Sequence, residues 1–446
     1  MLVEIFKAYD VRGVYKETID EDTCYKIGRA FVQFLKCKDV VVGTDMRISS
    51  PKLSNAFMKG VAFQGANVTY IGQVCTDAVY FASGFLNKPA VMFTASHNPP
   101  KYNGLKFCKA GAVPINEDTG LKQIKTIIEE NKFKKPSKKG KIANKDILKE
   151  YVKHVHKFIN AKKLSKLKIA VDAGNGMAGK IIPLVYKNTP VKIVPLYFRL
   201  DGTFPNHLAD PSKYENLVKL QETVKKEKCD FGMAFDGDAD RIFFVDEKAN
   251  VVNSSLTSAL IIKTLLSKKK KQKVIRNVVC SRIVLDTIKK FGGTPILERV
   301  GHSFIKNTMR KTKSIFACEH SAHYYFKENY CADSGIIASL IVSEIISQAK
   351  EPMSSLLDEF RVYHTIEETN AEVHDKQAKI DEIEAIYKKQ NPVKISKLDG
   401  ISIEFRDFWF NVRMSNTEPL LRLNLEATTS ELMEQKKNEV LGLMKR

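Results

Sequence analysis

Short apolar runs that end in polar loops are the feature that most restricts how this chain can fold. Residues 38–43 (KDVVVG), 90–94 (AVMFT) and 229–235 (CDFGMAF) each indicate a buried strand. Helical patterns lie between such runs, as in residues 54–65. Alternation of strands and helices predicts α/β domains, and open α/β sheets bind ligands beyond the carboxyl ends of their strands. The polar loops after these strands are therefore the first candidates for function.

The length of the chain and the order of these patterns predict four domains. A chain of 446 residues is longer than one hydrophobic core usually serves. The expected fold class is α/β, with three topologically similar mixed α/β domains and a smaller α+β C-terminal domain around a central cleft. The predicted limits of the four domains are residues 1–145, 146–249, 250–362 and 363–446.

The charge of the chain is strongly positive, with a formal net charge of +21. The excess is mostly lysine and is concentrated in two runs, residues 132–145 and 268–273. We interpret the first run as a linker, and both as solvated surface rather than as a nucleic-acid site. A basic surface would also attract anionic sugar phosphates.

No segment of the sequence predicts a membrane span or a metal-binding cysteine motif. The longest apolar candidate, residues 336–346, is interrupted by serine and glutamate. The N-terminus lacks the pattern of a signal peptide. The eight cysteines form no C-x-x-C pair, which favours free thiols in a reducing compartment. We therefore expect a cytoplasmic protein without membrane or nucleic-acid partners.

The first candidate loop contains Ser96 directly after a predicted strand. Pro99 and Pro100 end the regular structure there, so the loop can hold the serine outward as a nucleophile or a phosphate carrier. His97 is its neighbour, and Lys106 follows shortly after. A simple polar turn is the alternative, because a serine next to a histidine is common.

The second candidate loop carries three carboxylates at alternate positions, Asp236, Asp238 and Asp240, followed by Arg241. Such carboxylates can converge on one hard cation, and ligands that offer only oxygen favour Mg²⁺ or Ca²⁺ over zinc. A bound cation would also relieve their mutual repulsion. A solvated acidic turn is the alternative interpretation.

The third candidate loop, residues 318–324 (CEHSAHY), combines Glu319, Ser321 and His323. These side chains offer donors and acceptors for hydroxyl groups. The two histidines of the loop could also suggest zinc, but no third histidine or cysteine ligand follows a matching pattern. A polar turn between a strand and a helix is the alternative.

The fourth candidate loop, residues 413–419 (RMSNTEP), contains Arg413, with Arg422 shortly after it. Two guanidinium groups, two hydroxyls and backbone N–H groups suit a phosphate dianion. A capped turn that only stabilises the domain is the alternative.

These four loops, in this order, resemble the motifs of the α-D-phosphohexomutase superfamily: T-A-S-H-N-P, D-G-D-x-D-R, G-E-x-S-G-H and R-x-S-N-T-E-P with a later arginine. They span residues 94–422. Residues 6–13, 204–207 and 301–303 are most similar to the bacterial phosphomannomutase/phosphoglucomutase branch. The resemblance therefore covers essentially the whole chain.

The sequence departs from this pattern at a few positions. Cys318 and Ala322 stand where the third motif usually has glycine, and Ala239 replaces the middle glycine of the second. We expect these small residues to preserve the backbone. Val279 stands where the branch is expected to have a lysine that contacts substrate, which bears on the preferred sugar.

The resemblance implies a Mg²⁺-dependent isomerase that moves phosphate between the 1- and 6-positions of mannose and glucose phosphates. It implies a phosphoserine and a hexose 1,6-bisphosphate that is both intermediate and activator. The implied metal ligands are the phosphoserine of Ser96 with Asp236, Asp238 and Asp240. The implied catalytic residues are Ser96, His97, Lys106, His302, Arg12 and Arg241. The implied substrate contacts are Tyr9, Glu319, Ser321, His323, Arg413, Ser415, Asn416, Thr417 and Arg422. We expect small hexose phosphates as partners and a monomer or weak homodimer.

Three other functions compete with this interpretation. A phosphoglucosamine mutase would have similar serine and metal loops, although residues 301–303 (GHS) argue against it. A serine-dependent metallophosphatase usually needs two metal centres, whereas the sequence has one carboxylate cluster. A basic nucleic-acid-binding protein would bind DNA with a steep dependence on salt.

Overall fold

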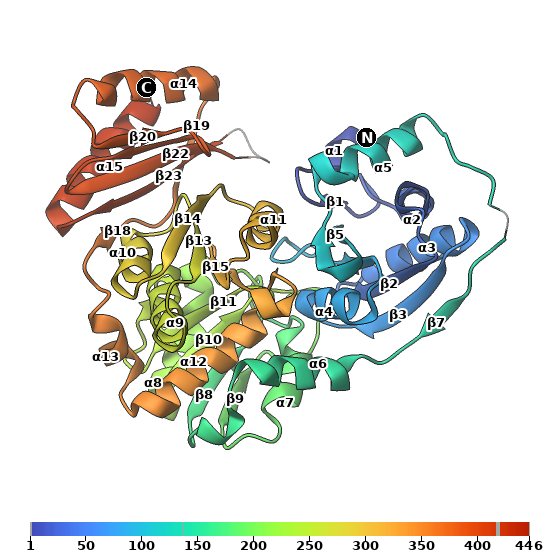
Figure 1. The fold of residues 1–446 in the computed structure, drawn as a ribbon, viewed down its shortest axis with the longest axis horizontal. Helices are drawn as coiled ribbons and strands as arrows, with labels where there is room; N and C mark the ends of the chain where they lie inside the picture. Colours follow the sequence, from blue (N-terminus) through green and yellow to red (C-terminus); the bar gives the residue numbers. More distant parts are fainter. Residues whose placement is uncertain (1, 137, 416–419, 446) are drawn as a thin grey trace.

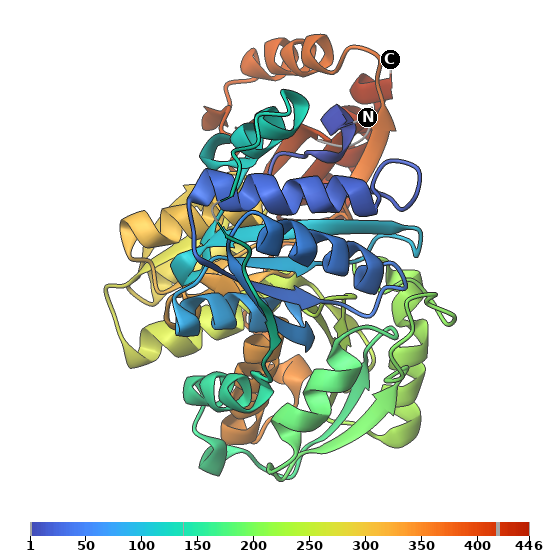
Figure 2. The ribbon, with the colours of Figure 1, turned by 90° about the vertical axis from the view of Figure 1, so that its right-hand side faces the viewer.

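The computed structural model describes residues 2–136, 138–415 and 420–445. It contains four sheets that follow one another along the chain (Figure 1). The second and third domains lie together at the centre, with the first at the right and the fourth at the upper left of Figure 1. Figure 2, viewed from the side of the first domain, shows the second domain below it and the fourth above it.

The first sheet has the strand order β1-β5-β4-β2-β3-β7, and β6 pairs with β5. Strand β2 is parallel to β3 and β4, whereas β5 is antiparallel to β4 and β1. Its strands are β1 (Val11–Val14), β2 (Asp39–Thr44), β3 (Asn67–Gln73), β4 (Ala90–Phe93), β5 (Tyr102–Lys109), β6 (Val113–Pro114) and β7 (Ile142–Asn144). The accompanying helices are α1 (Leu2–Ile5), α2 (Glu21–Leu35), α3 (Ser50–Phe63), α4 (Thr76–Leu86) and α5 (Leu121–Glu129).

The second and third sheets have the same topology. In each, the first strand is parallel to the next two, and the remaining strands are added antiparallel. The second has β8 (Lys168–Asp172), β9 (Lys192–Leu196), β10 (Phe231–Phe235), β11 (Ile242–Asp246) and β12 (Val251–Val252), with α6 (Leu148–Val155), α7 (Ala178–Tyr186) and α8 (Val218–Glu227). The third has β13 (Lys273–Asn277), β14 (Thr294–Glu298), β15 (Phe316–Cys318), β16 (Tyr324–Phe326) and β17 (Ala332–Asp333), with α9 (Ser254–Lys268), α10 (Arg282–Lys290), α11 (His302–Thr312), α12 (Gly335–Ala349) and α13 (Met353–Asp358).

The fourth sheet is antiparallel, with the order β18-β23-β22-β21-β20, and β19 also pairs with β23. Its strands are β18 (His364–Thr365), β19 (Thr369–Glu372), β20 (Lys394–Ser396), β21 (Ile401–Glu404), β22 (Phe408–Met414) and β23 (Leu420–Ala427). Helices α14 (Lys376–Lys388) and α15 (Ser430–Lys445) pack on this sheet and contribute to its core.

The buried hydrophobic side chains form several clusters, one of which crosses domain boundaries. One cluster of buried side chains extends from Val41 to Phe360 and joins the first three domains. The fourth domain has a cluster of its own, between Ile366 and Met444. The apolar candidate at residues 336–346 lies inside α12, which is buried on nearly every side at the centre of the shared core. Within the described residues, no helix is both long enough and apolar enough to cross a membrane.

The predicted α/β fold class is confirmed, and β2, β4 and β10 correspond to strands expected from the sequence. The interpretation of residues 132–145 as a plain linker is wrong at its end, because β7 adds a parallel strand to β3. All three residues of β7 are exposed, so no apolar pattern marks it. Backbone hydrogen bonds hold it in place, for example from Val68 N–H to the carbonyl of Lys141.

Candidate active site

Ser96 lies in a tight turn directly after the buried strand β4. Its backbone is left-handed (φ 50°), and its N–H donates to Thr94 Oγ1 at 2.9 Å. The side chain is almost fully buried, and its hydroxyl donates to Asp236 Oδ2 at 2.6 Å. A Cβ at Gly237 would lie 2.5 Å from the carbonyl oxygen of Ser96, so the two loops can meet this closely only because residue 237 is glycine.

Arg47 binds the backbone of the loop that contains Ser96. Sequence analysis missed this arginine. This arginine is 1% exposed and donates to four backbone carbonyls of the loop, at distances of 2.6–2.9 Å. The acceptors are the carbonyl oxygens of Ser96, Asn98, Pro99 and Tyr102. The position of Arg47 just beyond the carboxyl end of β2, beside β4, was the available signal.

The three aspartates of the second loop converge after strand β10. Oxygen atoms of Asp236, Asp238 and Asp240 all lie within 4.8 Å of one another, and all three residues are buried. Burial, followed by the charges of Asp240 and Asp238, raises the pKa of Asp236 well above its usual value. One oxygen each of Asp238 and Asp240 is buried without a hydrogen-bond partner. The cluster therefore fits a hard divalent cation with oxygen ligands.

Lys106, from β5, contacts the same cluster. Its Nζ lies 2.7 Å from Asp238 Oδ2 and 2.6 Å from Asp240 Oδ2. Burial acts to lower the pKa of this lysine, but the two carboxylates hold it well above its usual value. Lys106 is therefore a fixed positive charge at this site.

Arg241 and His97 complete the surroundings of the serine hydroxyl. Arg241 Nη2 donates to Ser96 Oγ at 3.2 Å, and its Nε lies 3.3 Å from Asp236 Oδ2. The same Nη2 also contacts His97 Nδ1. Burial, then the charges of Arg241 and Arg12, lower the pKa of His97 well below its usual value, so the ring is neutral and can accept from the arginine.

Arg12 and Tyr9 reach this region from the N-terminal segment. Arg12 pairs with Asp10 at 2.6 Å and donates to Asn98 Oδ1 at 2.5 Å, which ties it to the serine loop. The ring of Tyr9 meets the ring of His302 edge to face, with centroids 5.0 Å apart. His302 is the first residue of α11 in the third domain.

The third loop directly adjoins the second loop, which carries the three aspartates. Arg241 and His323 form an isolated antiparallel β-bridge, and His323 Nε2 lies 3.5 Å from Asp240 Oδ1. Ser321 Oγ is 3.0 Å from His323 Nδ1. Glu319 accepts from the N–H of Gly301 at 3.1 Å and from side chains of neighbouring strands, Asn277 on β13 and Tyr325 on β16. The structure thus brings loops of three domains together around Ser96 and the aspartates.

The alanines that replace glycine in these loops keep the glycine-like backbone. Ala239 has φ 61° and Ala322 has φ 63°, both in the left-handed region that favours glycine. Each alanine costs on the order of 1 kcal/mol relative to glycine at such a position. The expectation that these residues preserve the backbone is met in the structure.

The two arginines of the fourth loop face each other across β22 and β23, where Arg413 pairs with Arg422 in register. One carboxylate, Glu368, binds both: it lies 2.8 Å from Arg413 Nη2 and 2.7 Å from Arg422 Nη1. It also accepts from Asn424 Nδ2 at 3.0 Å. Burial acts to raise the pKa of Glu368, but Arg413 and Arg422 hold it at about 2. Sequence analysis missed this residue.

Two predicted phosphate ligands, Asn416 and Thr417, lie outside the described residues. Ser415 is described and nearly buried, and its N–H donates to the carbonyl of Leu420 at 2.9 Å. Within the described residues, no hydrogen bond or ion pair links the side chains of Arg413 or Arg422 to the first two domains.

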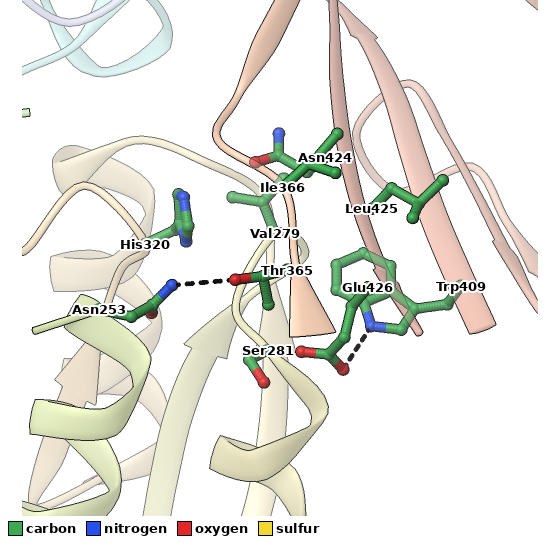
Figure 3. A pocket seen from close by; sticks show the side chains of 10 residues that line it. All are labelled: Asn253, Val279, Ser281, His320, Thr365, Ile366, Trp409, Asn424, Leu425 and Glu426. Carbon is green, nitrogen blue, oxygen red and sulfur yellow. Dashed lines mark hydrogen bonds between the residues drawn. The ribbon is translucent and has the colours of Figure 1, made fainter. Parts of the chain in front are cut away.

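Val279 lines a small cavity between the third and fourth domains (Figure 3). The cavity has a volume of about 10 Å³, the size of one water molecule. His320 of the third loop and Asn424 of β23 also line it. Trp409 Nε1 donates to Glu426 on its wall at 2.9 Å. The apolar side chain at 279 therefore lies at the contact between the third loop and the fourth domain.

Comparisons with known proteins agree along the whole chain. Four family models, for phosphoglucomutase/phosphomannomutase α/β/α domains I, II and III and its C-terminal domain, match residues 3–135, 149–249, 253–363 and 368–443. A phosphomannomutase of Vibrio cholerae is 38% identical over 99% of this chain and 98% of its own length. One from Methanocaldococcus jannaschii is 37% identical over 99% and 97%.

A solved structure from Burkholderia thailandensis, described as a phosphoglucomutase/phosphomannomutase family protein, superimposes with a TM-score of 0.91. It is 31% identical, and the match covers 99% of this chain and 96% of that one. The chain belongs to the phosphoglucomutase/phosphomannomutase family. It is a phosphohexose mutase, an enzyme of the isomerase class.

Proposed function

We propose that this mutase interconverts the 1- and 6-phosphates of mannose and of glucose, through a phosphoserine at Ser96 and a hexose 1,6-bisphosphate. The observation that carries the proposal is the position of the Ser96 hydroxyl, 2.6 Å from Asp236 and 3.2 Å from Arg241, beside a buried carboxylate cluster. A serine held between a cation site and a guanidinium suits a group that carries phosphate. Two of the similar relatives are named phosphomannomutases, which supports mannose phosphates as substrates.

Mg²⁺ is the metal that this proposal assigns to Asp236, Asp238 and Asp240, together with the phosphoserine. Bound there, the ion would neutralise negative charge on the transferring phosphoryl group. The buried Oδ1 of Asp238, which has no hydrogen-bond partner, supports the assignment. Lys106 and Arg241 add fixed positive charge on either side of the cluster.

The proposed reaction is a pair of phosphoryl transfers that are the reverse of each other. In the first, the bond between phosphorus and Ser96 Oγ breaks and the free sugar hydroxyl forms the new P–O bond. The hydroxyl proton is lost from the sugar and a proton is gained by Ser96 Oγ. The resulting bisphosphate turns end for end and returns its other phosphate to Ser96. Arg241, which already donates to Ser96 Oγ, would stabilise the charge on that oxygen in both steps.

Lys106 does not suit the role of general base in this scheme. With no metal bound, its ammonium group lies between two carboxylates that hold its pKa well above the usual value. A general base needs a pKa near the working pH. The proposal therefore gives Lys106 an electrostatic role.

Substrate binding is assigned to the third and fourth loops. Arg413, Arg422 and Ser415, with Asn416 and Thr417, would bind the phosphate that is not being transferred. Glu319, Ser321 and His323, with Tyr9, would bind the sugar hydroxyls. Because the bisphosphate must bind in two orientations, these contacts have to accept either end of the sugar.

A coupled assay tests the proposal. Mannose 1-phosphate, glucose 1-phosphate and glucosamine 1-phosphate are each offered with Mg²⁺ and a catalytic amount of the matching 1,6-bisphosphate. We expect turnover of the first two, and a loss of at least about 10⁴-fold in Ser96→Ala, as for removal of a nucleophile. Ser267→Ala, an exposed position on α9, is the control and should keep full activity.

Other outcomes of this assay would contradict the proposal. Turnover of glucosamine 1-phosphate alone would identify a phosphoglucosamine mutase. Net release of inorganic phosphate at the rate of substrate loss would identify a phosphatase. Undiminished interconversion by Ser96→Ala would exclude Ser96 as the carrier.

A further inference from the structure

Lys306 is a buried charged residue that the proposed reaction does not use. It lies on α11 and is 0% exposed. Its Nζ is 2.7 Å from Asp333 Oδ1 at the end of β17 and 3.7 Å above the ring of Tyr80 on α4. Burial lowers the pKa of Lys306, whereas the carboxylate of Asp333 and the aromatic face of Tyr80 favour its ammonium form. A lysine is rarely fully buried unless it is paired, and Asp333 is the partner that accounts for the burial of Lys306.

The third neighbour of Lys306 is the ring of His302. The two residues are four apart on α11, so their side chains lie on the same face of the helix. Lys306 Nζ is 3.4 Å from His302 Nδ1. It is the only hydrogen bond of the His302 ring within the described part of the chain. An ammonium group only donates, so Nδ1 must accept, and the proton of the neutral ring must be on Nε2.

The surroundings of His302 also disfavour its charged form. Burial, followed by the positive charges of Lys306, Lys106 and His323, lowers the pKa of His302 well below its usual value, and Asp240 opposes this. The titratable and charged groups that face the ring are Tyr9, Lys106, Asp240, Lys306 and His323, with Asp333 and Tyr80 behind Lys306. The two lysines therefore oppose protonation of the ring, and Asp240 is the carboxylate that favours it.

We propose that Lys306 is a positioning residue that keeps His302 neutral with its proton on Nε2, so that His302 donates a hydrogen bond to the substrate and is not the general base. A neutral imidazole that carries its proton on the outward nitrogen can polarise a sugar or phosphoryl oxygen. It cannot accept the hydroxyl proton at that nitrogen. The edge contact with Tyr9, an expected substrate residue, puts the ring at the border of the substrate region. The role toward substrate rests on the proposed function, whereas the tautomer does not.

The tautomer is measured directly by long-range ¹H–¹⁵N NMR on the full chain labelled at histidine. The His302 signals are assigned by their loss in His302→Gln. We expect a neutral ring with the proton on Nε2, unchanged from about pH 5.5 to 8, the range in which histidine usually titrates. A protonated Nδ1, or an imidazolium near pH 7, would overturn the proposal.

The variant Lys306→Met tests whether Lys306 is what keeps the His302 ring neutral with its proton on Nε2. Removing the neighbouring positive charge should raise the pKa of His302 toward its ordinary value and allow both tautomers. Lys311→Met, an exposed lysine on the same helix, should leave the His302 signals unchanged. If the single variant does not fold because Asp333 is left buried and unpaired, Lys306→Met/Asp333→Asn removes both charges and should give the same change in His302. Unaltered His302 signals in these variants would overturn the proposal.

The kinetics of His302→Gln show whether His302 acts as a hydrogen-bond donor or as a general base. Glutamine can still donate a hydrogen bond, so we expect kcat to fall by less than about tenfold, which is the cost of losing one hydrogen bond outright. Loss of a general base would cost about 10²–10⁴-fold, and that result would overturn the proposal. If no hexose phosphate is turned over at all, the proposed function fails, while the NMR result still decides the role of Lys306.

Discussion

The two ends of the proposed site are held in different ways. At the Ser96 end, contacts cross between domains: Lys106 on β5 forms ion pairs with Asp238 and Asp240 after β10, and the backbone of Arg241 forms a β-bridge with His323 of the third domain. These domains share one hydrophobic cluster. At the other end, Arg413 and Arg422 are held by Glu368 within the fourth domain, which has its own core.

This difference suggests that one end of the proposed site serves the transfer step and the other serves substrate binding. Charges at the Ser96 end are fixed by several domains at once, which suits a transition state that needs groups already in place. The arginine end belongs to one separately packed domain, which suits binding and release of the far phosphate. Changes at the first end should therefore lower kcat, and changes at the second should mainly raise KM.

Arg47→Met should have the largest effect of the variants that leave the proposed catalytic groups in place. It removes the donors to four carbonyls of the serine loop, so Ser96 would no longer be held in its left-handed turn. We expect kcat to fall about 10²-fold with little change in KM, because misplacement of a reacting group by about 1 Å has this cost. Steady-state kinetics with glucose 1-phosphate measure it.

Arg199→Met, at an exposed arginine, is the control for this variant and should behave like the parent enzyme. A rise in KM with kcat intact in Arg47→Met would break the comparison, because it would give the Ser96 end a binding role.

Glu368→Gln should have an intermediate effect at the opposite end. Without the carboxylate, two guanidinium groups directly opposite each other on β22 and β23 repel and lose their alignment. We expect KM to rise about tenfold while kcat changes less than about threefold. Glu367→Gln, at the exposed neighbouring glutamate, should leave both constants unchanged. A fall in KM would show that Glu368 competes with the phosphate instead of aligning the arginines.

The same carboxylate predicts a dependence of stability on pH. The arginines lower the pKa of Glu368 in the folded state to about 2, below its value of about 4.3 in an unfolded chain. Its contribution to stability is therefore complete above about pH 4.3 and is lost as the pH falls toward 2. Denaturant unfolding should show a difference between parent and Glu368→Gln that is constant near neutrality and shrinks across this window. A difference that does not depend on pH would contradict the ion-pair account.

Arg282→Lys should have the smallest effect of these variants. It tests whether the contact between α10 and the fourth domain affects substrate binding and not the transfer step. Arg282, at the start of α10, donates to the carbonyls of Phe405, Arg406 and Phe408 in the turn between β21 and β22. Lysine cannot reproduce this fork of donors. We expect a rise in KM of about threefold and faster amide exchange around residues 405–408, with kcat unchanged. A large loss of kcat would mean that the fourth domain takes part in the transfer itself.

The sequence predicted the loops that the structure brings together, but it did not predict the groups that hold them. Ser96 and the three aspartates follow buried strands, and the rule that ligands bind beyond strand ends was sufficient to select them. β7 was missed because its exposed residues are held only by backbone pairing. Glu368 was missed because its partners are set by the register of antiparallel strands, which no local pattern encodes.

Lys306 shows a further limit of sequence analysis. In a chain this rich in lysine, one more lysine on a helix looks like solvated surface. Its spacing of four residues from His302 was the available signal, and its burial depends on packing against Tyr80 and Asp333 from other elements. Contacts between domains could therefore be identified only from the structure.

The central claim is that Ser96 carries the phosphate, and intact-protein mass spectrometry tests it most directly. After incubation with glucose 1,6-bisphosphate and Mg²⁺, the account predicts a mass gain of one phosphoryl group that peptide mapping assigns to Ser96. Excess glucose 6-phosphate should remove it, and Ser96→Ala should never acquire it. Turnover without any covalent phosphate, or with the phosphate on another residue, would contradict the account.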